Sequence, residues 1–179
     1  ANRATEILGG KLGQYLVNPN NHVNMAQSTN DVIPTTTRIT ILFLLKDLIA
    51  EARKLEWALR KKADEFKKIL KVGRTHYEDA VPITLGQEFE AYAVSIAKDI
   101  ERMVKSSEEL KELGIGGTAI GTGITTHPKF HDTIVKKLNE LTKLDLKTTK
   151  NMVELTQSYN CFVSFSSTLN MLAIDLFRI

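Results

Sequence analysis

Uncharged hydrogen-bonding side chains gather in the run from Gln27 to Asp31, directly ahead of a long helical pattern, where Ser28, Thr29 and Asn30 follow one another. One such residue would be enough to cap a helix, because a single side-chain oxygen accepts an unpaired N–H of the first turn. A helix N-terminus that carries two hydroxyls and an amide also suits a carboxylate, since free N–H groups and the positive dipole end favour an anion. The run therefore indicates either a plain cap or a carboxylate-binding site.

Thr75 and His76 form a second candidate for chemistry, with Arg74 before them and Asp79 close behind. Histidine exchanges a proton near neutral pH, so beside a hydroxyl and carboxylates it can act as an acid, a base or a binding group for an amine. The alternative is an ordinary surface histidine. We expect Arg74 to form an ion pair with a carboxylate such as that of Asp79 rather than to bind a substrate.

Glycines are concentrated in residues 113–128, where Gly114 to Ala119 fits a relaxed G-x-G-x-x-A pattern. Dinucleotide binding requires a strand before this pattern and a helix after it, whereas here a long amphipathic helix precedes it and more glycines follow. We expect these glycines to let the backbone pass close to other helices or to a ligand. His127 and His131 have the helical spacing of metal ligands, but no third ligand is evident, so no metal site is predicted.

Three long stretches, residues 45–69, 89–110 and 155–176, carry apolar residues at alternating steps of three and four, which is the spacing of a helix seam. A shorter helix is expected at about 128–141. The flanks of the third stretch are also apolar or small, which predicts burial in a larger core or in an oligomer. No convincing strand is found, and Pro82 is expected in a connection. The pattern predicts an all-α fold, a bundle of long helices.

The composition favours one soluble globular domain, because the chain has 179 residues, of which 42% are hydrophobic and 25% charged. The net charge of +3 is spread thinly, which gives no sign of a nucleic-acid partner. No apolar run reaches the ~18 residues of a membrane span, and the single cysteine, Cys161, is expected to be a small buried hydrophobe. We therefore expect a cytoplasmic protein without a membrane partner. Helical patterns at both ends lack start and stop signals, so the sequence is expected to be a piece of a longer chain.

Four segments in order, ANRATEILGG, HVNMAQSTND, GRTHYEDAVPITLGQEF and GGTAIGTG, are similar to the motifs of the aspartase/fumarase superfamily, and the match covers nearly the whole chain. The resemblance implies an all-α homotetramer in which the long central helices of the subunits pack into one bundle. Each active site would draw residues from three subunits. Residues 1–30 would be the end of an N-terminal domain with an entry loop, and residues 31–179 a truncated central helical bundle domain.

The resemblance also implies the chemistry, a reversible anti-elimination from a succinyl-type substrate that releases fumarate through an enediolate. The difficult step removes a weakly acidic proton beside a carboxylate, so the site must stabilise two negative charges there. By motif position, Ser28 and Thr29 would hold that carboxylate, and Asn30 would contact the leaving amino or hydroxyl group. Thr75 would bind the other carboxylate, and His76 would be catalytic, orienting the leaving group or its proton partner. No metal or organic cofactor is implied.

Within the superfamily, the Q-S-T-N-D run and the N-P-N of residues 18–20 resemble aspartate ammonia-lyases, so L-aspartate and fumarate are the favoured dicarboxylate ligands. The G-G of residues 9–10 and the T-H-P of residues 126–128 resemble class II fumarases, which are the alternative. A third interpretation is an inactive helical oligomerisation scaffold. The chain departs from both enzymes at Glu78, where a Gln is usual, and at Thr125, where an Asn is usual.

The catalytic base of the family, a Ser in a G-S-S-x-M-P-x-K-x-N-P loop, would lie beyond Ile179, together with a substrate-binding Lys and Asn. We therefore expect the isolated chain of 179 residues to be inactive or nearly so. Fumarate formation from L-aspartate by that chain, at rates typical of the family, would contradict this expectation.

Overall fold

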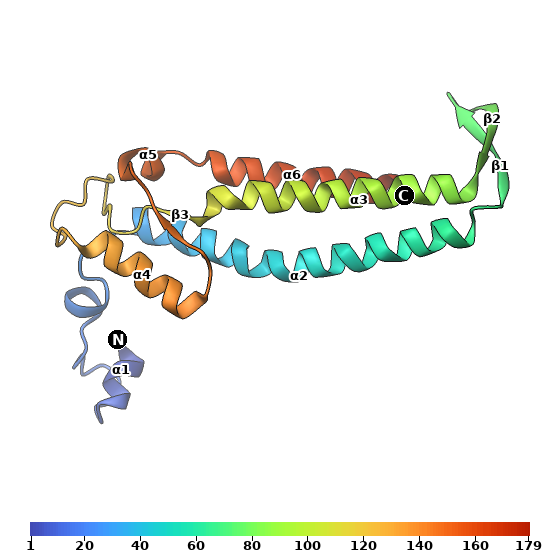
Figure 1. The fold of residues 1–179 in the computed structure, drawn as a ribbon. Helices are drawn as coiled ribbons and strands as arrows, with labels where there is room; N and C mark the ends of the chain where they lie inside the picture. The colour runs from blue at the N-terminus through green and yellow to red at the C-terminus, as the bar shows by residue number, and fades with distance from the viewer. The chain divides into compact units, whose positions relative to one another are not determined.

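The computed structural model describes all 179 residues, and they form two compact units. Unit 1 contains Ala1–Ile39 and Lys111–Ser158, and unit 2 contains Thr40–Leu110 and Tyr159–Ile179. The longest helix, α2 (Thr29–Glu65), begins in unit 1 and ends in unit 2 (Figure 1). No helix combines the length and the apolar character that a membrane span needs.

Unit 2 is built on the larger part of α2 together with α3 (Leu85–Ser107) and α6 (Asn160–Arg178), and α3 and α6 lie side by side (Figure 1). The predicted seams are largely the buried faces of these helices. Their buried apolar side chains are Leu42, Leu45, Ala52, Leu59 and Ala63 of α2, Ala93, Ile96, Ile100 and Met103 of α3, and Cys161, Phe165 and Leu172 of α6. The structure therefore confirms the expected all-α architecture of long helices and the expected burial of the cysteine.

The third predicted stretch, residues 155–176, is not one helix. The structure divides it into α5 (Met152–Gln157) in unit 1 and α6 in unit 2. The backbone is extended at Ser158 (φ −92°, ψ 127°), and Tyr159 precedes the first residue of α6. Serine and asparagine favour caps and turns, because their side chains bond to nearby backbone groups, and the sequence here is Ser-Tyr-Asn. Weak local helix propensity thus interrupts a seam whose apolar spacing continues through the break.

Unit 2 also contains an antiparallel hairpin of β1 (Leu70–Thr75) and β2 (Glu78–Thr84), so the expectation of no strand was wrong. Most of its side chains are exposed, and it therefore lacks the buried alternate face by which a strand is recognised in a sequence. Pro82 lies within β2, opposite Val72, rather than in a connection. A two-stranded ribbon tolerates a proline because each strand keeps one unpaired edge.

Unit 1 consists of shorter elements together with the first turns of α2. They are α1 (Asn2–Ile7), a π-helical turn (Pro19–Val23), β3 (Glu112–Leu113), α4 (Phe130–Thr142), β4 (Lys147–Thr148) and α5, and a 3₁₀ turn (Glu108–Lys111) leads into β3. The two short strands pair in parallel. The helix α4 confirms the one predicted at about residues 128–141.

Candidate functional site

Ser28 takes up most of the unpaired N–H groups at the start of α2. Its hydroxyl oxygen accepts the N–H of Asn30 at 3.2 Å, and its carbonyl accepts those of Asp31 and Val32 at 3.3 and 3.0 Å. Ser28 is therefore the cap, where the sequence favours Asn30 or Asp31, because α2 begins at Thr29. A hydroxyl that accepts a hydrogen bond keeps its own proton to donate. The helix start thus offers a carboxylate the N–H of Thr29 and the hydroxyl protons of Ser28 and Thr29.

A shallow pocket of about 220 Å³ lies beside these donors, within unit 1. Its lining residues are Asn24, Gln27, Ser28, Thr29, Val32 and Ile33. Amides and hydroxyls provide the polar lining, Val32 and Ile33 provide the apolar part, and no charged side chain takes part. Such a pocket can bind a small anion through hydrogen bonds alone, because no Lys or Arg side chain lines it to neutralise the charge of the anion.

Asn30 points toward the glycine-rich loop, and it does not line this pocket. Its Nδ2 donates a hydrogen bond to the carbonyl oxygen of Ala119 at 2.7 Å. Because a carbonyl oxygen can only accept, this bond determines which end of the amide is the NH₂ group. The Oδ1 of Asn30 is left to accept a hydrogen bond from a donor such as an ammonium group. The structure therefore brings Ser28 and Thr29 into one pocket and holds Asn30 in a separate contact beside it.

Thr75 and His76 lie at the tip of the hairpin, where His76 and Tyr77 form a two-residue loop between the paired Thr75 and Glu78. Both loop residues have a left-handed backbone, with φ of 53° and 63°. This conformation costs a residue with a Cβ about 1–2 kcal/mol, and loops of this kind normally use Asn-Gly. Backbone strain of this sort is concentrated at functional sites. The loop side chains are exposed, with Tyr77 at 97%, so the tip projects from the rest of unit 2 into solvent.

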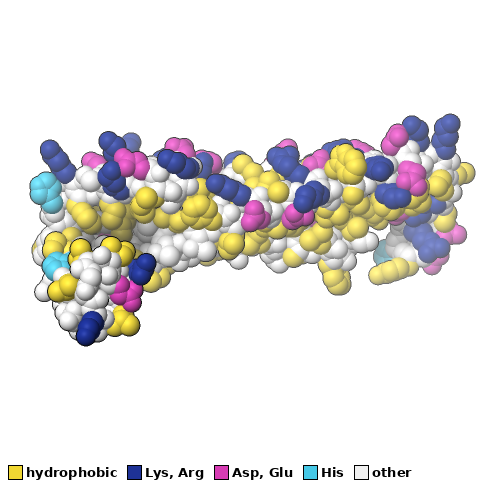
Figure 2. Space-filling view, turned by 90° about the horizontal axis from the view of Figure 1, so that it is seen from below, with side chains coloured by type: hydrophobic (Ala, Val, Ile, Leu, Met, Phe, Trp, Pro, Cys, Tyr) yellow, Lys and Arg dark blue, Asp and Glu magenta, His cyan; other side chains and the backbone are white.

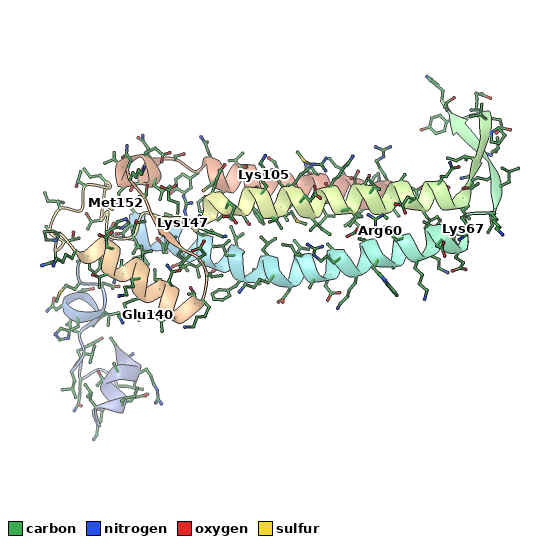
Figure 3. All side chains as sticks on the ribbon, viewed as in Figure 1. Arg60, Lys67, Lys105, Glu140, Lys147 and Met152 are labelled. Atoms are coloured by element: carbon green, nitrogen blue, oxygen red, sulfur yellow. The ribbon has the colours of Figure 1, made fainter.

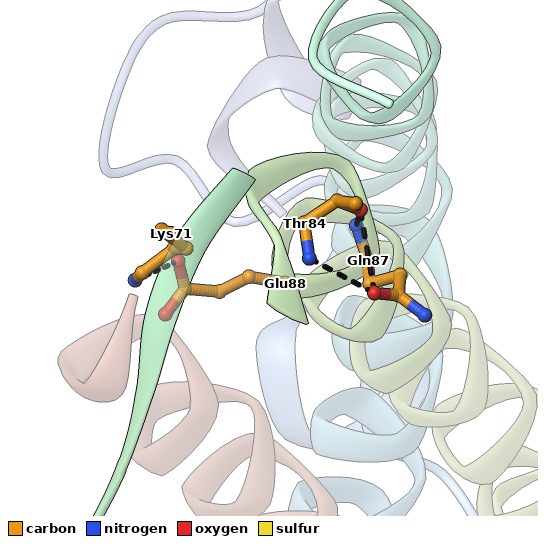
Figure 4. A network of polar contacts seen from close by, with 4 residues as sticks. All are labelled: Lys71, Thr84, Gln87 and Glu88. Atoms are coloured by element: carbon orange, nitrogen blue, oxygen red, sulfur yellow. Dashed lines mark hydrogen bonds and ion pairs between the residues drawn. The ribbon is translucent and has the colours of Figure 1, made fainter. Parts of the chain in front are cut away.

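Polar contacts fix the base of this hairpin to α3 (Figure 4). Lys71 of β1 forms a 2.7 Å ion pair with Glu88 of α3. Thr84 and Gln87 form a capping box, in which the Gln87 N–H donates to Thr84 Oγ1 at 3.2 Å and the Thr84 N–H donates to Gln87 Oε1 at 2.9 Å. The strained tip is thus carried on a base that is hydrogen-bonded to a long helix.

An exposed ion pair joins the two strands near the tip. Arg74 Nε lies 3.4 Å from Asp79 Oδ1, which confirms the predicted partner of Arg74. Because both side chains are largely exposed, the pair contributes little to stability. It leaves the guanidinium engaged with the hairpin itself.

The glycine-rich loop passes close to α5, as predicted. A Cβ added to Gly121 would lie 2.5 Å from the Cα of Val153, next to Met152, which Figure 3 labels. The loop follows the short strand β3, but turns rather than a helix come after its first glycines. It therefore lacks the strand–loop–helix setting of a dinucleotide site.

Both histidines near this loop bond to neighbouring backbone. His127 Nδ1 accepts the N–H of Lys129 at 3.1 Å, and His131 Nδ1 lies 2.6 Å from the carbonyl oxygen of Ile115. No three His, Cys, Asp or Glu side chains are grouped so that they could hold a metal ion. These histidines therefore contribute to the loop structure.

The candidate residues fall into two groups. Ser28, Thr29 and Asn30 belong to unit 1, and Thr75 and His76 belong to unit 2. Along the chain, the rest of α2 after Asn30 and most of β1 lie between the two groups. Sequence reasoning missed the contacts that hold each group in place, because the carbonyl that orients the Asn30 amide is 89 residues away and carries no local signal.

A family model described as a lyase matches residues 1–179. The chain belongs to this lyase family. The lyase chain is 43% identical to the aspartate ammonia-lyase of a Bacillus species, over all of the chain and 38% of that relative. It is 44% identical to the mitochondrial fumarate hydratase of Saccharomyces cerevisiae, over all of the chain and 37% of that relative. These matches confirm the resemblance to the aspartase/fumarase superfamily.

A solved structure shares the fold of the lyase chain. A fumarate lyase:delta crystallin from Brucella melitensis bound to cobalt matches 98% of the chain with a TM-score of 0.96 and 41% sequence identity. The match covers 38% of that structure. The lyase chain therefore spans about two fifths of the length of the relatives that it matches.

Proposed function

We propose that this lyase chain is the central part of an aspartate ammonia-lyase, which converts L-aspartate to fumarate and ammonia. A base removes a proton from the carbon next to the side-chain carboxylate, and the electron pair moves into that carboxylate to form the enediolate. When the enediolate collapses, the carbon–carbon double bond forms and the amino group leaves. The observation that carries the proposal is the uncharged pocket at the start of α2, with hydroxyl and N–H donors on one side.

In this proposal Ser28 and Thr29 bind the carboxylate that becomes the enediolate. Their donors meet a charge that grows during proton removal, and they therefore stabilise the transition state more than the substrate. Asn30 contacts the leaving amino group. Its Nδ2 is bound to the Ala119 carbonyl, so its Oδ1 can accept a hydrogen bond from that group. Thr75 binds the other carboxylate, and His76 orients the leaving group or its proton partner. The elimination changes no overall oxidation state, so the proposal includes no redox cofactor.

We further propose that each active site joins residues of different copies in a homotetramer. Exposed apolar side chains on the long helices support such an assembly, and Figure 2 shows many of them between the charged groups. On α6 the exposed face is spaced by steps of three and four, like the buried face, and consists of Val163, Ser167, Asn170, Ile174 and Phe177. Phe177 is 92% exposed. Covering this uncharged face would remove apolar area from water, which stabilises an interface by about 25 cal/mol per Å².

We also propose two domains for the chain and a cytoplasmic location for the protein. Residues 1–30 would end an N-terminal domain, and residues 31–179 would form the central helical domain. The compact units of the structure change after Ile39, Leu110 and Ser158, and α2 runs through both of them. A cytoplasmic location is supported by the single buried cysteine.

The proposal is tested with the full-length protein that contains this chain, incubated with L-aspartate or L-malate while fumarate is followed by its ultraviolet absorbance. We expect fumarate from L-aspartate. Thr29→Ala should lower kcat/KM by about 100-fold or more, because it removes a donor aimed at the developing charge. Thr36→Ala is the matched control, since the Thr36 hydroxyl bonds only to the Val32 carbonyl of its own helix at 2.8 Å, and its kcat/KM should stay near wild type.

A class II fumarase is the second candidate, supported by the 44% identity to the yeast fumarate hydratase over the whole chain. Fumarate from L-malate alone would establish this alternative and contradict the first. If neither substrate reacts, both enzyme proposals fail, and the inactive helical scaffold becomes the better interpretation.

A further inference from the structure

Asp31, in the first turn of α2, has a buried carboxylate whose two oxygens both accept hydrogen bonds from backbone N–H groups. Asp31 as a whole residue is 2% exposed. Oδ1 accepts the N–H of Ser28 at 2.9 Å, and Oδ2 accepts those of Gly116 at 3.1 Å and Thr118 at 2.9 Å. Hydrogen bonds to an ionised acceptor are about twice as strong as neutral ones. One side chain thus links the start of α2 to a loop about 85 residues further along the chain.

The loop is shaped so that its N–H groups converge on this carboxylate. Gly116 and Thr118 have φ of 96° and 58°, and this left-handed backbone points both N–H groups at one oxygen. Successive backbone N–H groups arranged in this way form a concave anion site. In this chain the anion is the side chain of Asp31.

The same loop orients the Asn30 amide through the carbonyl of Ala119, the residue after Thr118. Asp31 therefore fixes the backbone of Ser28 on one side and, through the loop, the amide of Asn30 on the other. The relative placement of the Ser28 hydroxyl and the Asn30 Oδ1 depends on a residue that does not line the pocket.

We propose that Asp31 is a positioning residue of this lyase, which clamps the loop 116–119 to the start of α2 so that the donors for the enediolate and the acceptor for the amine hold one geometry. The proposal rests on the proposed function. Asp31 does not touch the substrate, and it acts through Ser28 and Asn30. A displacement of about 1 Å at a reacting group can lower a rate by about 100-fold, so loss of the clamp should have a large effect.

The test compares two ligands of the full-length protein by isothermal titration calorimetry. Succinate resembles the substrate, and the nitronate form of 3-nitropropionate carries two negative oxygens on one centre, as the enediolate does. In Asp31→Asn we expect the nitronate to bind about 100-fold more weakly, while the affinity for succinate changes by roughly threefold or less. Equal changes for both ligands, or no change for either, would overturn the proposal.

The ratio of the two dissociation constants distinguishes positioning from loss of folded protein, because partial unfolding lowers the number of binding sites and leaves the ratio unchanged. Asp145→Asn is the matched control in the same unit. Its carboxylate is exposed, with Lys147 Nζ 4.0 Å away, so the ratio should equal that of the wild type.

A second variant changes the loop residue that donates to Asp31. In Gly116→Ala the Cβ would lie 3.2 Å from the Cα of His131 at a φ that disfavours alanine, so the Gly116 N–H must shift away from Asp31. The same change in ligand ratio is expected, which keeps the proposal testable if Asp31→Asn does not fold.

Hydrogen–deuterium exchange of residues 111–124 separates this proposal from the proposed function, since it needs no activity. We expect faster exchange there in Asp31→Asn or Gly116→Ala than in the wild type, and unchanged exchange would overturn the clamp. If the wild type forms no fumarate, the proposed function fails while the exchange result still decides the clamp.

Discussion

Replacing Gly86 by alanine should loosen the junction between the end of α2 and the start of α3. A Cβ on Gly86 would lie 2.5 Å from the carbonyl oxygen of Ala63, 2.6 Å from the Cα of Lys67 and 2.7 Å from its nitrogen. Ordinary contacts of a Cβ begin at 3.4 Å, and all three neighbours are backbone atoms that no side-chain rotation can move. Figure 3 labels Lys67 at the end of α2.

The expected effect follows from two opposing terms. Forcing a methyl group into a filled contact costs about 1–3 kcal/mol, and the better helix propensity of alanine returns at most about 1 kcal/mol. We expect a net loss of about 1–2 kcal/mol, which raises the population of the open state by roughly 5- to 30-fold. Since the hairpin with His76 joins α3 at this junction, kcat should fall as well.

Hydrogen–deuterium exchange of residues 66–90 in the full-length protein measures this opening. Gly114→Ala is the matched control, because its Cβ would meet only the Leu155 side chain, at 3.4 Å, and its exchange should remain near that of the wild type. If Gly86→Ala exchanges at the wild-type rate, the close backbone contact is not a feature of the folded protein and the reasoning is refuted.

Two further predictions concern charge and strain in unit 2. Burial raises the pKa of the Asp99 carboxyl above 3.8, against the hydrogen bond from Arg102 and with the help of the nearby Asp175, so the folded state favours its protonated form. This stabilisation is fully present below the ordinary pKa of an aspartate and is lost as the pH rises through the raised pKa of Asp99. Over this pH range the melting temperature of the wild type should fall, and Asp99→Asn should make the fall smaller. An equal fall of the melting temperature in both proteins would contradict the assignment. Tyr77→Gly should stabilise the hairpin by about 1 kcal/mol, because Tyr77 is 97% exposed and glycine accepts φ of 63° without strain, and slower amide exchange in β1 would show it.

The long helices could be predicted from the sequence because a helix seam is a local pattern. Ile96, Ile100 and Met103 stand four and three residues apart, and all are buried on α3. The hairpin could not be predicted in the same way, because a strand pair depends on its partner and this one buries no face. Its loop lacks the Asn-Gly signal, since His76 and Tyr77 adopt the left-handed backbone instead.

The candidate site was predictable only where its chemistry is local. Ser28 and Thr29 stand next to each other at a helix start, so a cap and a set of uncharged donors in this run could be expected from the order of residues. The orientation of Asn30 follows from the Ala119 carbonyl, and the burial of Asp31 follows from the loop that bonds to it. These contacts join segments more than 80 residues apart, and a single sequence gives no signal for them.

The contacts of Asp31 also explain how an acidic residue can stand directly behind the proposed site for a carboxylate. A free carboxylate there would repel an anion held by Ser28 and Thr29, and the repulsion would grow as the bound group gains its second negative charge. Burial and bonds to backbone N–H groups direct the charge of Asp31 toward the loop, while the pocket side keeps uncharged donors. Hydrogen bonds from such donors strengthen as the acceptor becomes more charged. Only the difference between the binding of the substrate and that of the enediolate lowers the barrier, and in this proposal the uncharged donors supply that difference as the charge grows.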